Sequence, residues 1–355
     1  MARRTRATGW KALLGVGLAV ATAGTGCLPR ALAARMILEP HRRAVQETLD
    51  PPHVEVAFPG DGVELRGWLF PARPPARGTV IFLHGRNQNR DAGIVVARRL
   101  VPLGYDVLAY DSRAHGASDG QYSTFGYYEK WDVSRAIDFL GADRVVLAGV
   151  SLGSAVAIQA AAEDPRVVGV VAVSSFSSMA EIVRERIPRL VGDRQVRDAL
   201  REVEQRSGMR VKDADSVAAA RHVSVPVLLL HGDEDEFTPL LHTQQIYAAL
   251  RGEREIVQVP GAHHADVLRF DAAWEAILAW LPSVREGGVR WAAQIQRHDA
   301  DPDVGAHSRR DLDRVGEGAP LAPAQALEAD GVVPGPGVGA IGGARAEALR
   351  VQLAQ

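Results

Sequence analysis

The alternation of short apolar runs with helix-forming segments constrains the fold of this chain more than any other feature. Eight runs rich in valine, isoleucine and leucine lie at residues 54–58, 63–70, 79–84, 105–110, 144–149, 167–175, 225–231 and 255–259. Helix-like segments separate the later runs. Continuous apolar strands that alternate with helices are typical of a mainly parallel sheet with helices on both faces. The sequence therefore predicts an α/β fold with a mostly parallel eight-stranded sheet.

Two connections depart from this alternation. Only the sequence PGDG separates the first two runs, which predicts an antiparallel hairpin at the sheet edge. Between the sixth and seventh runs, residues 176–222 form a charged segment of helical composition that is too long for a simple connection. We expect this segment to form a short helical cap insertion over a site.

Composition separates the remaining parts of the chain from this domain. Residues 53–285 are expected to form the α/β domain, and residues 30–52 are interpreted as a linker. Residues 286–355 are rich in glycine, alanine and proline and contain few aromatic residues. Such a composition cannot bury a core, which predicts a disordered tail.

The first 29 residues have the layout of a targeting segment. Four basic residues precede an uncharged run from Ala12 to Pro29, as in a secretory signal or a signal anchor. The sequence GTGC resembles a bacterial lipoprotein cleavage site with Cys27 as the lipidated residue, although Gly24 stands where a leucine-type residue is usual. The predicted location is the outer side of the cytoplasmic membrane, by lipid or by anchor. A cleaved, secreted form and cytosolic retention are the alternatives.

Charge and cysteine content exclude several classes of partner. The 41 basic and 43 acidic residues nearly cancel, and no long basic stripe marks the central region, so nucleic acid is not an expected partner. The single cysteine excludes an internal disulfide and a cysteine-rich zinc site. No histidine pair has the helical spacing of a zinc site, and the sequence predicts neither a metal nor a cofactor.

Two serines lie in G-x-S-x-G patterns, and their contexts distinguish them. Ser151, in GVSLG, follows an apolar strand and precedes the helix-forming sequence SAVAIQAAAE. A nucleophile elbow requires that strand, turn and helix. Ser118, in GASDG, has loop-like sequence on both sides. Ser151 is therefore the candidate nucleophile, and Ser118 is expected to be a loop residue.

A serine hydroxyl needs a base, and usually a carboxylate that orients the base. Both residue types follow later strands, where loops of a parallel sheet converge on one edge. The acidic run at residues 233–236 follows the seventh strand, and His263 and His264 follow the eighth. The order of serine, acid and histidine along the chain is suited to nucleophilic catalysis, but neighbouring residues compete for two of the three roles.

These motifs resemble the α/β-hydrolase superfamily over roughly residues 63–281, and within it the serine aminopeptidases and monoacylglycerol lipase-like hydrolases. The family pattern H-G-x-x-D-x-x-x-P resembles HGDEDEFTP and implies that Asp235 is the acid, with Asp233 as second choice. The pattern G-x-x-H resembles GAHH and implies that His264 is the base, with His263 as bystander.

The same resemblance nominates the oxyanion hole. The segment FLHGRNQNR resembles the loop that supplies one main-chain donor, which implies Arg86, with Asn87 as the alternative. The second donor is the amide of Leu152, because the residue after an elbow serine begins a helix.

The segment YDSRAHGASDG resembles a family loop in which the serine is structural, with Ala114 where glycine is usual. We expect Arg113 to anchor this loop through Asp111 or a carbonyl, with contact to an acidic substrate as the alternative. Three further histidines are expected to pack or to bind loops: His84, His115 and His231.

The resemblance implies a serine hydrolase that cleaves acyl or lipid-like esters through an acyl-enzyme. A serine aminopeptidase acting on peptides is the alternative, and a non-catalytic ligand-binding protein is a second one. Ser151 excludes dehalogenase and epoxide-hydrolase chemistry, which needs an aspartate at the elbow. Because a fold does not determine its substrate, the motifs leave the substrate open.

Overall fold

The computed structural model describes residues 30–46, 50–188 and 190–281 of the 355-residue chain. The predicted targeting segment (residues 1–29) and the predicted tail (residues 286–355) lie outside the described residues. Within those described ranges, no helix is both long and apolar enough to cross a bilayer.

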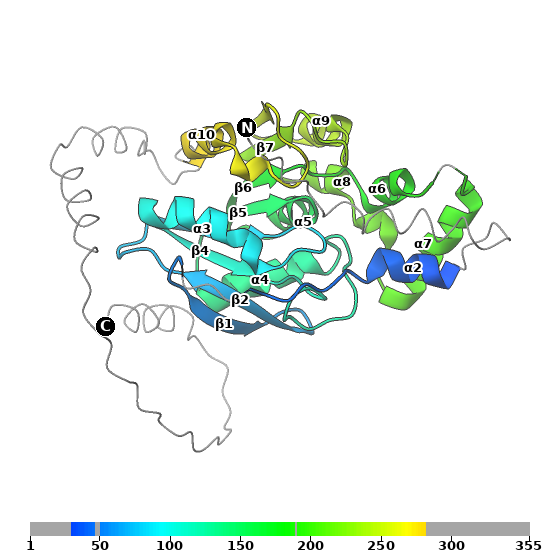
Figure 1. The fold of residues 1–355 in the computed structure, drawn as a ribbon, viewed down its shortest axis with the longest axis horizontal. Helices are drawn as coiled ribbons and strands as arrows, with labels where there is room; N and C mark the ends of the chain where they lie inside the picture. Colours follow the sequence, from blue (N-terminus) through cyan, green and yellow to red (C-terminus); the bar gives the residue numbers. More distant parts are fainter. Residues whose placement is uncertain (1–29, 47–49, 189, 282–355) are drawn as a thin grey trace, which may run out of the picture.

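Eight strands form one sheet, as the sequence predicted, and the structure shows their order to be β1-β2-β4-β3-β5-β6-β7-β8 (Figure 1). Their bounds are β1 Val54–Pro59, β2 Glu64–Phe70, β3 Gly78–Leu83, β4 Tyr105–Tyr110, β5 Val145–Val150, β6 Val167–Val173, β7 Val227–Gly232 and β8 Arg254–Val259. Strands β1 and β2 form the predicted antiparallel hairpin at the edge, and β2 also pairs antiparallel with β4. All other neighbouring strands are parallel.

Helices cover both faces of the sheet, and a separate apolar core lies under each group of helices. One face carries α3 (Ile94–Leu100) and α10 (Asp271–Trp280). The other face carries α4 (Glu129–Leu140), α5 (Leu152–Ala161), α8 (Ser216–Ala220) and α9 (Leu240–Ala249). Residues 152–160 of α5 are all buried, which explains why this helix is almost uniformly apolar rather than amphipathic.

The predicted cap region contains two helices that extend beyond the sheet, α6 (Met179–Arg186) and α7 (Asp193–Ser207). A short turn, η4 (Val211–Asp213), leads from α7 to α8, which packs against α5 and α9. The helices α6 and α7 thus form the outer part of the insertion between β6 and β7, at one end of the molecule in Figure 1.

The structure differs from the predicted linker over residues 30–52. It contains the helix α2 (Arg30–Leu38), which packs against α7 (Figure 1). Ala34, Ile37 and Leu38 are spaced so that they form one buried helical face. Helix α7 packs against α2, and no feature of the sequence predicted that the two segments meet.

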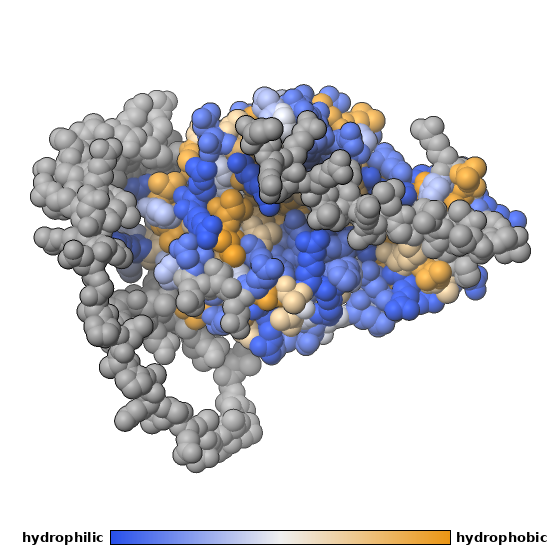
Figure 2. All heavy atoms as spheres, viewed as in Figure 1, coloured by the Kyte–Doolittle hydropathy of each residue, from blue (hydrophilic) through white to orange (hydrophobic). Residues whose placement is uncertain are grey.

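Polar side chains dominate the face shown in Figure 2, and apolar ones are scattered among them. The large apolar side chains that are exposed in the described residues are Leu32, Leu103, Trp131, Leu190 and Leu241. They come from different elements, and apolar residues scattered in this way are usual on a protein surface.

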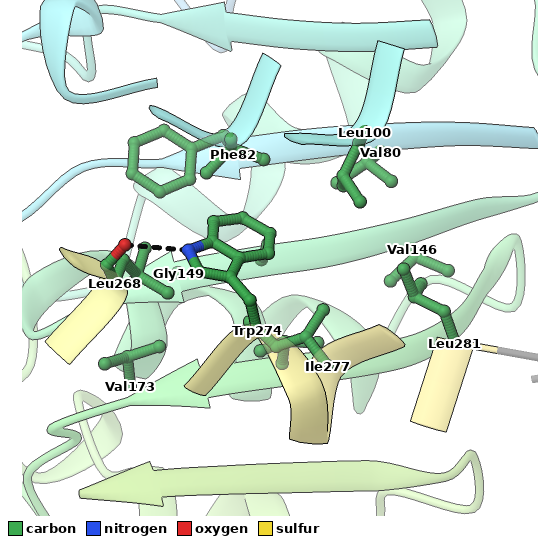
Figure 3. A pocket seen from close by; sticks show the side chains of 13 residues that line it. Val80, Phe82, Leu100, Val146, Gly149, Val173, Leu268, Trp274, Ile277 and Leu281 are labelled. Carbon is green, nitrogen blue, oxygen red and sulfur yellow. Dashed lines mark hydrogen bonds between the residues drawn. The ribbon is translucent and has the colours of Figure 1, made fainter. Parts of the chain in front are cut away.

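A cavity of about 20 Å³ lies between the sheet and α10 (Figure 3). Its walls are apolar side chains and a glycine, including Phe82, Ile277 and the ring of Trp274. The indole Nε1 of Trp274 donates to the Leu268 carbonyl oxygen at 2.8 Å. A ligand pocket is far larger and carries polar groups that orient its ligand, so this cavity is a packing feature of the core.

Candidate active site

Ser151 occupies the sharp turn between β5 and α5. Its backbone has φ 53° and ψ −109°, a conformation that costs free energy for any residue with a side chain. The Ser151 N–H donates to the Val173 carbonyl oxygen of β6 at 2.8 Å, which helps to hold the turn. A non-glycine residue kept in such a conformation is typical of a nucleophile elbow.

The glycines on either side of Ser151 are required by close backbone packing. A Cβ atom added to Gly149 would lie 2.3 Å from the carbonyl carbon of Gly153. A Cβ atom on Gly153 would lie 2.0 Å from the Leu83 carbonyl oxygen, at the end of β3. The G-x-S-x-G spacing therefore lets the helix start directly against two strands.

The structure brings Ser151, His264 and Asp235 together in one hydrogen-bonded series. The Nε2 atom of His264 lies 2.9 Å from Ser151 Oγ, and its Nδ1 atom lies 2.9 Å from Asp235 Oδ2. These side chains come from the loops after β5, β8 and β7, at one edge of the parallel sheet. With the proton on Nδ1, Nε2 of His264 can accept the Ser151 proton.

The Asp235 carboxylate is buried and fully engaged. Its Oδ1 atom accepts hydrogen bonds from the main-chain N–H groups of Phe237 at 2.9 Å and Thr238 at 2.8 Å. Burial alone would raise the pKa of Asp235, but the interaction with His264 and the Thr238 hydrogen bond outweigh burial and hold the pKa below its usual value. The carboxylate is therefore ionised at neutral pH.

The second-choice residues lie outside this series. Asp233 is exposed, and its Oδ1 atom accepts a hydrogen bond from the Gly261 N–H at 2.6 Å. The ring of His263 is half exposed, and its Nδ1 atom lies 2.9 Å from the Glu234 carbonyl oxygen. Both residues brace the two loops against each other.

Ser118 is a buried loop residue, as its sequence context predicted. Its hydroxyl donates to the Asp111 carbonyl oxygen at 2.6 Å and accepts from the Arg66 N–H at 2.9 Å. These bonds tie its loop to the edge of β2. Ala114, in the same loop, has φ 66°, which explains why a glycine is usual at this position in similar sequences.

His84, His115 and His231 bind loops, as predicted. Ser112 N–H donates to His84 Nε2 at 3.0 Å, and His115 Nδ1 lies 2.9 Å from the Arg113 carbonyl oxygen. Burial lowers the pKa of His84. Burial is also the main cause that lowers the pKa of His115 to about 3, and the nearby His84 adds to it. Both rings are therefore neutral at pH 7.

His231 lies closer to the candidate acid than the sequence suggested. Its Nε2 atom lies 2.9 Å from the Thr238 carbonyl oxygen and 3.5 Å from Asp235 Oδ2, and its Nδ1 atom lies 2.8 Å from Thr243 Oγ1. Burial lowers the pKa of His231, which keeps the ring neutral. His231 thus supports the loop of Asp235 through its contact with the Thr238 carbonyl oxygen, a role that no sequence motif identified.

The two proposed oxyanion donors have free N–H groups. Among the described residues, neither the Leu152 N–H nor the Arg86 N–H has a hydrogen-bond acceptor. Leu152 is the first residue of α5, where main-chain N–H groups point out of the helix. The loop of Arg86 lies against the elbow, since a Cβ atom on Gly85 would lie 3.5 Å from the Val150 carbonyl oxygen.

The side chain of Arg86 joins this loop to the N-terminal helix α2. One guanidinium nitrogen donates to the carbonyl oxygens of Met36 at 3.0 Å and Glu39 at 3.2 Å. Burial lowers the pKa of Arg86 to about 10, so the side chain remains a cation. The neighbouring Asn87 has φ 60°, and its side-chain oxygen accepts from the His41 N–H at 2.8 Å.

Arg113 anchors its loop through a carbonyl oxygen, as predicted, and through a carboxylate other than Asp111. Its guanidinium donates two hydrogen bonds to Asp132, at 2.7 and 2.8 Å, and one to the Asp61 carbonyl oxygen at 2.9 Å. Asp111 instead accepts from the Arg90 N–H at 2.7 Å. These bonds occupy Arg113, which leaves it unsuited to contact an acidic substrate.

Two further side chains near His264 had no signal in the sequence. The Phe237 ring lies 4.6 Å from the His264 ring, and the Arg186 guanidinium carbon lies 3.3 Å from the centre of the Phe237 ring. Arg186 belongs to the cap helix α6, where no motif marks functional residues. In the described part of the chain, no cluster of three or more histidine, cysteine, aspartate or glutamate side chains could hold a metal ion.

This chain is similar to a family model, to a protein of related sequence and to solved structures with the same fold. Residues 78–222 match a family model described as the alpha/beta hydrolase fold. An uncharacterized protein of Mycobacterium tuberculosis is 30% identical over 213 residues, which covers 58% of this chain and 70% of that protein. The esterase Pf2001 of Pyrococcus furiosus has a TM-score of 0.54 at 22% identity, over 68% of this chain and 96% of the esterase. A bacterial membrane phospholipase A has a TM-score of 0.52 at 17% identity, over 77% of this chain and 94% of the phospholipase. The two solved structures share the fold.

Proposed function

This chain belongs to the α/β-hydrolase superfamily, and from that premise we propose that it is a serine hydrolase that cleaves carboxylic esters through an acyl-enzyme. The observation that carries the proposal is the series of 2.9 Å contacts from Asp235 through His264 to Ser151 Oγ. The strained turn at Ser151 and the free N–H groups of Leu152 and Arg86 support the same chemistry.

In this mechanism His264 Nε2 takes the proton of Ser151 Oγ while the oxygen attacks the ester carbonyl carbon. The N–H groups of Leu152 and Arg86 stabilise the oxyanion of the tetrahedral intermediate, and each such donor lowers the barrier by about 3 kcal/mol. The intermediate collapses, and His264 transfers its proton to the departing alkoxide. Water then attacks the acyl-enzyme with His264 again as base, which releases the acid and restores Ser151.

Asp235 supports both half-reactions without exchanging a proton. Its carboxylate holds the Nδ1 proton of His264 and stabilises the imidazolium that forms when Nε2 is protonated. The depressed pKa of Asp235 is suited to this role, because the group stays ionised while the histidine changes charge.

The choice of an ester as substrate draws on the structural neighbours, which include an esterase and a phospholipase A. An acyl or lipid-like ester is the substrate class we propose. We further propose that the N-terminal segment holds the enzyme at the outer side of the cytoplasmic membrane, by lipidation at Cys27 or by an uncleaved anchor. Support for this location comes from the basic head and the uncharged run of the sequence.

The test of the proposed function compares two serines. Ser151→Ala should abolish both the hydrolysis of 4-nitrophenyl butyrate and the labelling of the protein by a fluorophosphonate probe. Ser118→Ala, which changes the other serine in a G-x-S-x-G pattern, should retain most of both. Hydrolysis or labelling that survives in the Ser151 variant would exclude this mechanism.

A further inference from the structure

We propose that Arg186, on the cap helix α6, forms an anion-binding subsite that selects esters bearing a phosphate or carboxylate group. The inference rests on the proposed hydrolase function and names the substrate class of that same site. Neither the fold nor the Ser151, Asp235 and His264 series specifies a charged substrate, so the subsite is a property of this chain's own cap.

The position of Arg186 brings a positive charge close to the reacting atoms. Its guanidinium carbon lies 3.3 Å from the centre of the Phe237 ring. That ring in turn lies 4.6 Å from the His264 ring at an angle of 39°, and the Phe237 N–H donates to Asp235 Oδ1. One aromatic ring therefore separates the cation from the catalytic histidine.

The charge of Arg186 has no partner within the described chain. Arg184, two residues earlier on the same helix, pairs with Asp193 at 3.1 Å. Within the described ranges, Arg186 has no carboxylate oxygen within 4.0 Å and no hydrogen-bond acceptor. Its N–H groups are therefore available to a ligand.

Two arginines in the loops after β3 and β4 are already engaged. Arg86 donates to the carbonyl oxygens of Met36 and Glu39, and Arg113 is bound by Asp132. This contrast identifies Arg186 as the cation beside His264 that can meet a substrate.

The local carboxylates do not neutralise Arg186. Burial lowers the pKa of Arg186, and the charges of Glu185 and Asp235 oppose that effect only in part. Glu185 itself lies 2.9 Å from His242 Nε2, and Asp235 is bound to His264. Arg186 is an exposed residue, and a guanidinium without a counterion is free to pair with an incoming anion.

The chemistry of the guanidinium indicates which anions would bind. Stacking on Phe237 orients the plane of the group and leaves its edge free to donate two parallel hydrogen bonds. Phosphate and carboxylate oxygens have the spacing that accepts such a pair. An acidic group on either the alcohol or the acyl side of the ester would satisfy this geometry.

The experiment uses two pairs of esters that differ in one charged group, with the full-length protein. The first pair is 1-butyrylglycerol 3-phosphate and 1-butyrylglycerol, which places the charge on the alcohol side. The second pair is the mono-4-nitrophenyl ester of adipic acid and 4-nitrophenyl hexanoate, which places the charge on the acyl side. Short acyl chains avoid micelles, and the Ser151→Ala protein gives the uncatalysed background.

We expect the wild-type protein to hydrolyse the charged member of at least one pair with the higher kcat/KM. Arg186→Gln should reduce the ratio of charged to neutral kcat/KM at least about tenfold, which corresponds to the loss of one charge-assisted interaction of about 1.4 kcal/mol. Arg186→Lys should keep part of that ratio, because it preserves the charge but not the paired donors. Arg184→Gln, the matched control on the same helix, should leave the ratio unchanged.

Inorganic phosphate provides a second measurement that needs no charged ester. It should inhibit wild-type hydrolysis of 4-nitrophenyl hexanoate competitively, and more strongly than it inhibits the Arg186→Gln protein. Equal kcat/KM within both pairs, or an unchanged ratio in Arg186→Gln, would overturn the subsite while the hydrolase proposal stands. Absence of any Ser151-dependent hydrolysis or fluorophosphonate labelling would overturn the proposed function, and the subsite with it.

Discussion

At the scale of single residues, one substitution at Asp235 and one at Asp233 can show which of the two aspartates is the catalytic acid. Asp235→Asn should reduce kcat on the order of 10⁴-fold, the loss known for the same change in a protease triad. The amide would donate to Nδ1 of His264 and leave the wrong nitrogen protonated. Asp233→Asn should reduce kcat little, because Asp233 binds only the Gly261 N–H in the opposing loop. Steady-state kinetics of both variants measures the two losses of kcat. A larger loss in Asp233→Asn than in Asp235→Asn would show that Asp233 is the acid.

A second residue-scale prediction concerns pH and the buried His115. The pKa of this ring is about 3 in the folded protein, below its ordinary value of 6.5. Below about pH 6.5 the unfolded chain therefore binds a proton that the folded protein does not, and stability falls as the pH falls towards about 3. The loss is about 1.4 kcal/mol per pH unit for this one group.

The measurement is urea unfolding of the wild-type protein and of His115→Phe at pH 7 and pH 5. The wild-type protein should lose about 2 kcal/mol more than the variant over this interval, since only the wild-type ring titrates in the unfolded chain. Some pH dependence should persist in the variant, because burial also lowers the pKa of His84. Equal losses in the two proteins would contradict this account of His115.

At the scale of elements, the N-terminal helix α2 is linked to the oxyanion loop. Arg86 donates to the main chain at the end of α2, and Arg30 at its start pairs with Glu202 of α7 at 3.2 Å. The helix therefore connects the cap to the loop that carries a proposed oxyanion donor. A chain that begins at residue 30 retains these contacts, whereas one that begins at residue 47 loses them.

We expect the shorter chain to show a kcat about tenfold lower than the longer one, with a smaller change in KM. Loss of its two acceptors would leave the Arg86 cation buried and unpaired, which favours movement of the loop away from the elbow. The fluorophosphonate inactivation rate should fall in parallel, because it reports the same oxyanion geometry. If the shorter chain does not fold, Arg86→Met tests whether the contact between Arg86 and α2 supports catalysis. An unchanged kcat in Arg86→Met would contradict that role.

At the scale of the whole molecule, the proposed location can be tested by fractionation. The full-length protein should sediment with membranes and resist extraction by high salt, since an anchor is held by apolar burial rather than by charge. Cys27→Ser should abolish the incorporation of a labelled fatty acid if the lipoprotein form is the correct one. Recovery of the protein with an intact N-terminus in the cytosolic fraction would refute both anchored forms.

The fold was predictable from sequence because its determinants are local and repeated. Each strand is a short apolar run that remains apolar whichever neighbour it pairs with, and the short PGDG connection favoured an edge hairpin. The candidate elbow was also identifiable, because the glycines beside Ser151 are required by atoms of the adjoining strands and helix. The loops after parallel strands meet at one edge, which indicated that an acid and a histidine would lie near Ser151. The resemblance to the family patterns selected Asp235 over Asp233 and His264 over His263.

Sequence patterns thus established the class of fold, its eight mostly parallel strands and the candidate residues able to react. The position of β4 between β2 and β3 is known from the structure alone. The contacts between distant segments are known from the folded chain alone: helix α2 meets α7 and Arg86, Arg113 meets Asp132, and Arg186 meets Phe237. The physical reason is that periodicity and turn chemistry act over a few residues, whereas these contacts join segments that the path of the whole chain brings together. The free charge of Arg186 is visible only once its neighbours are in place.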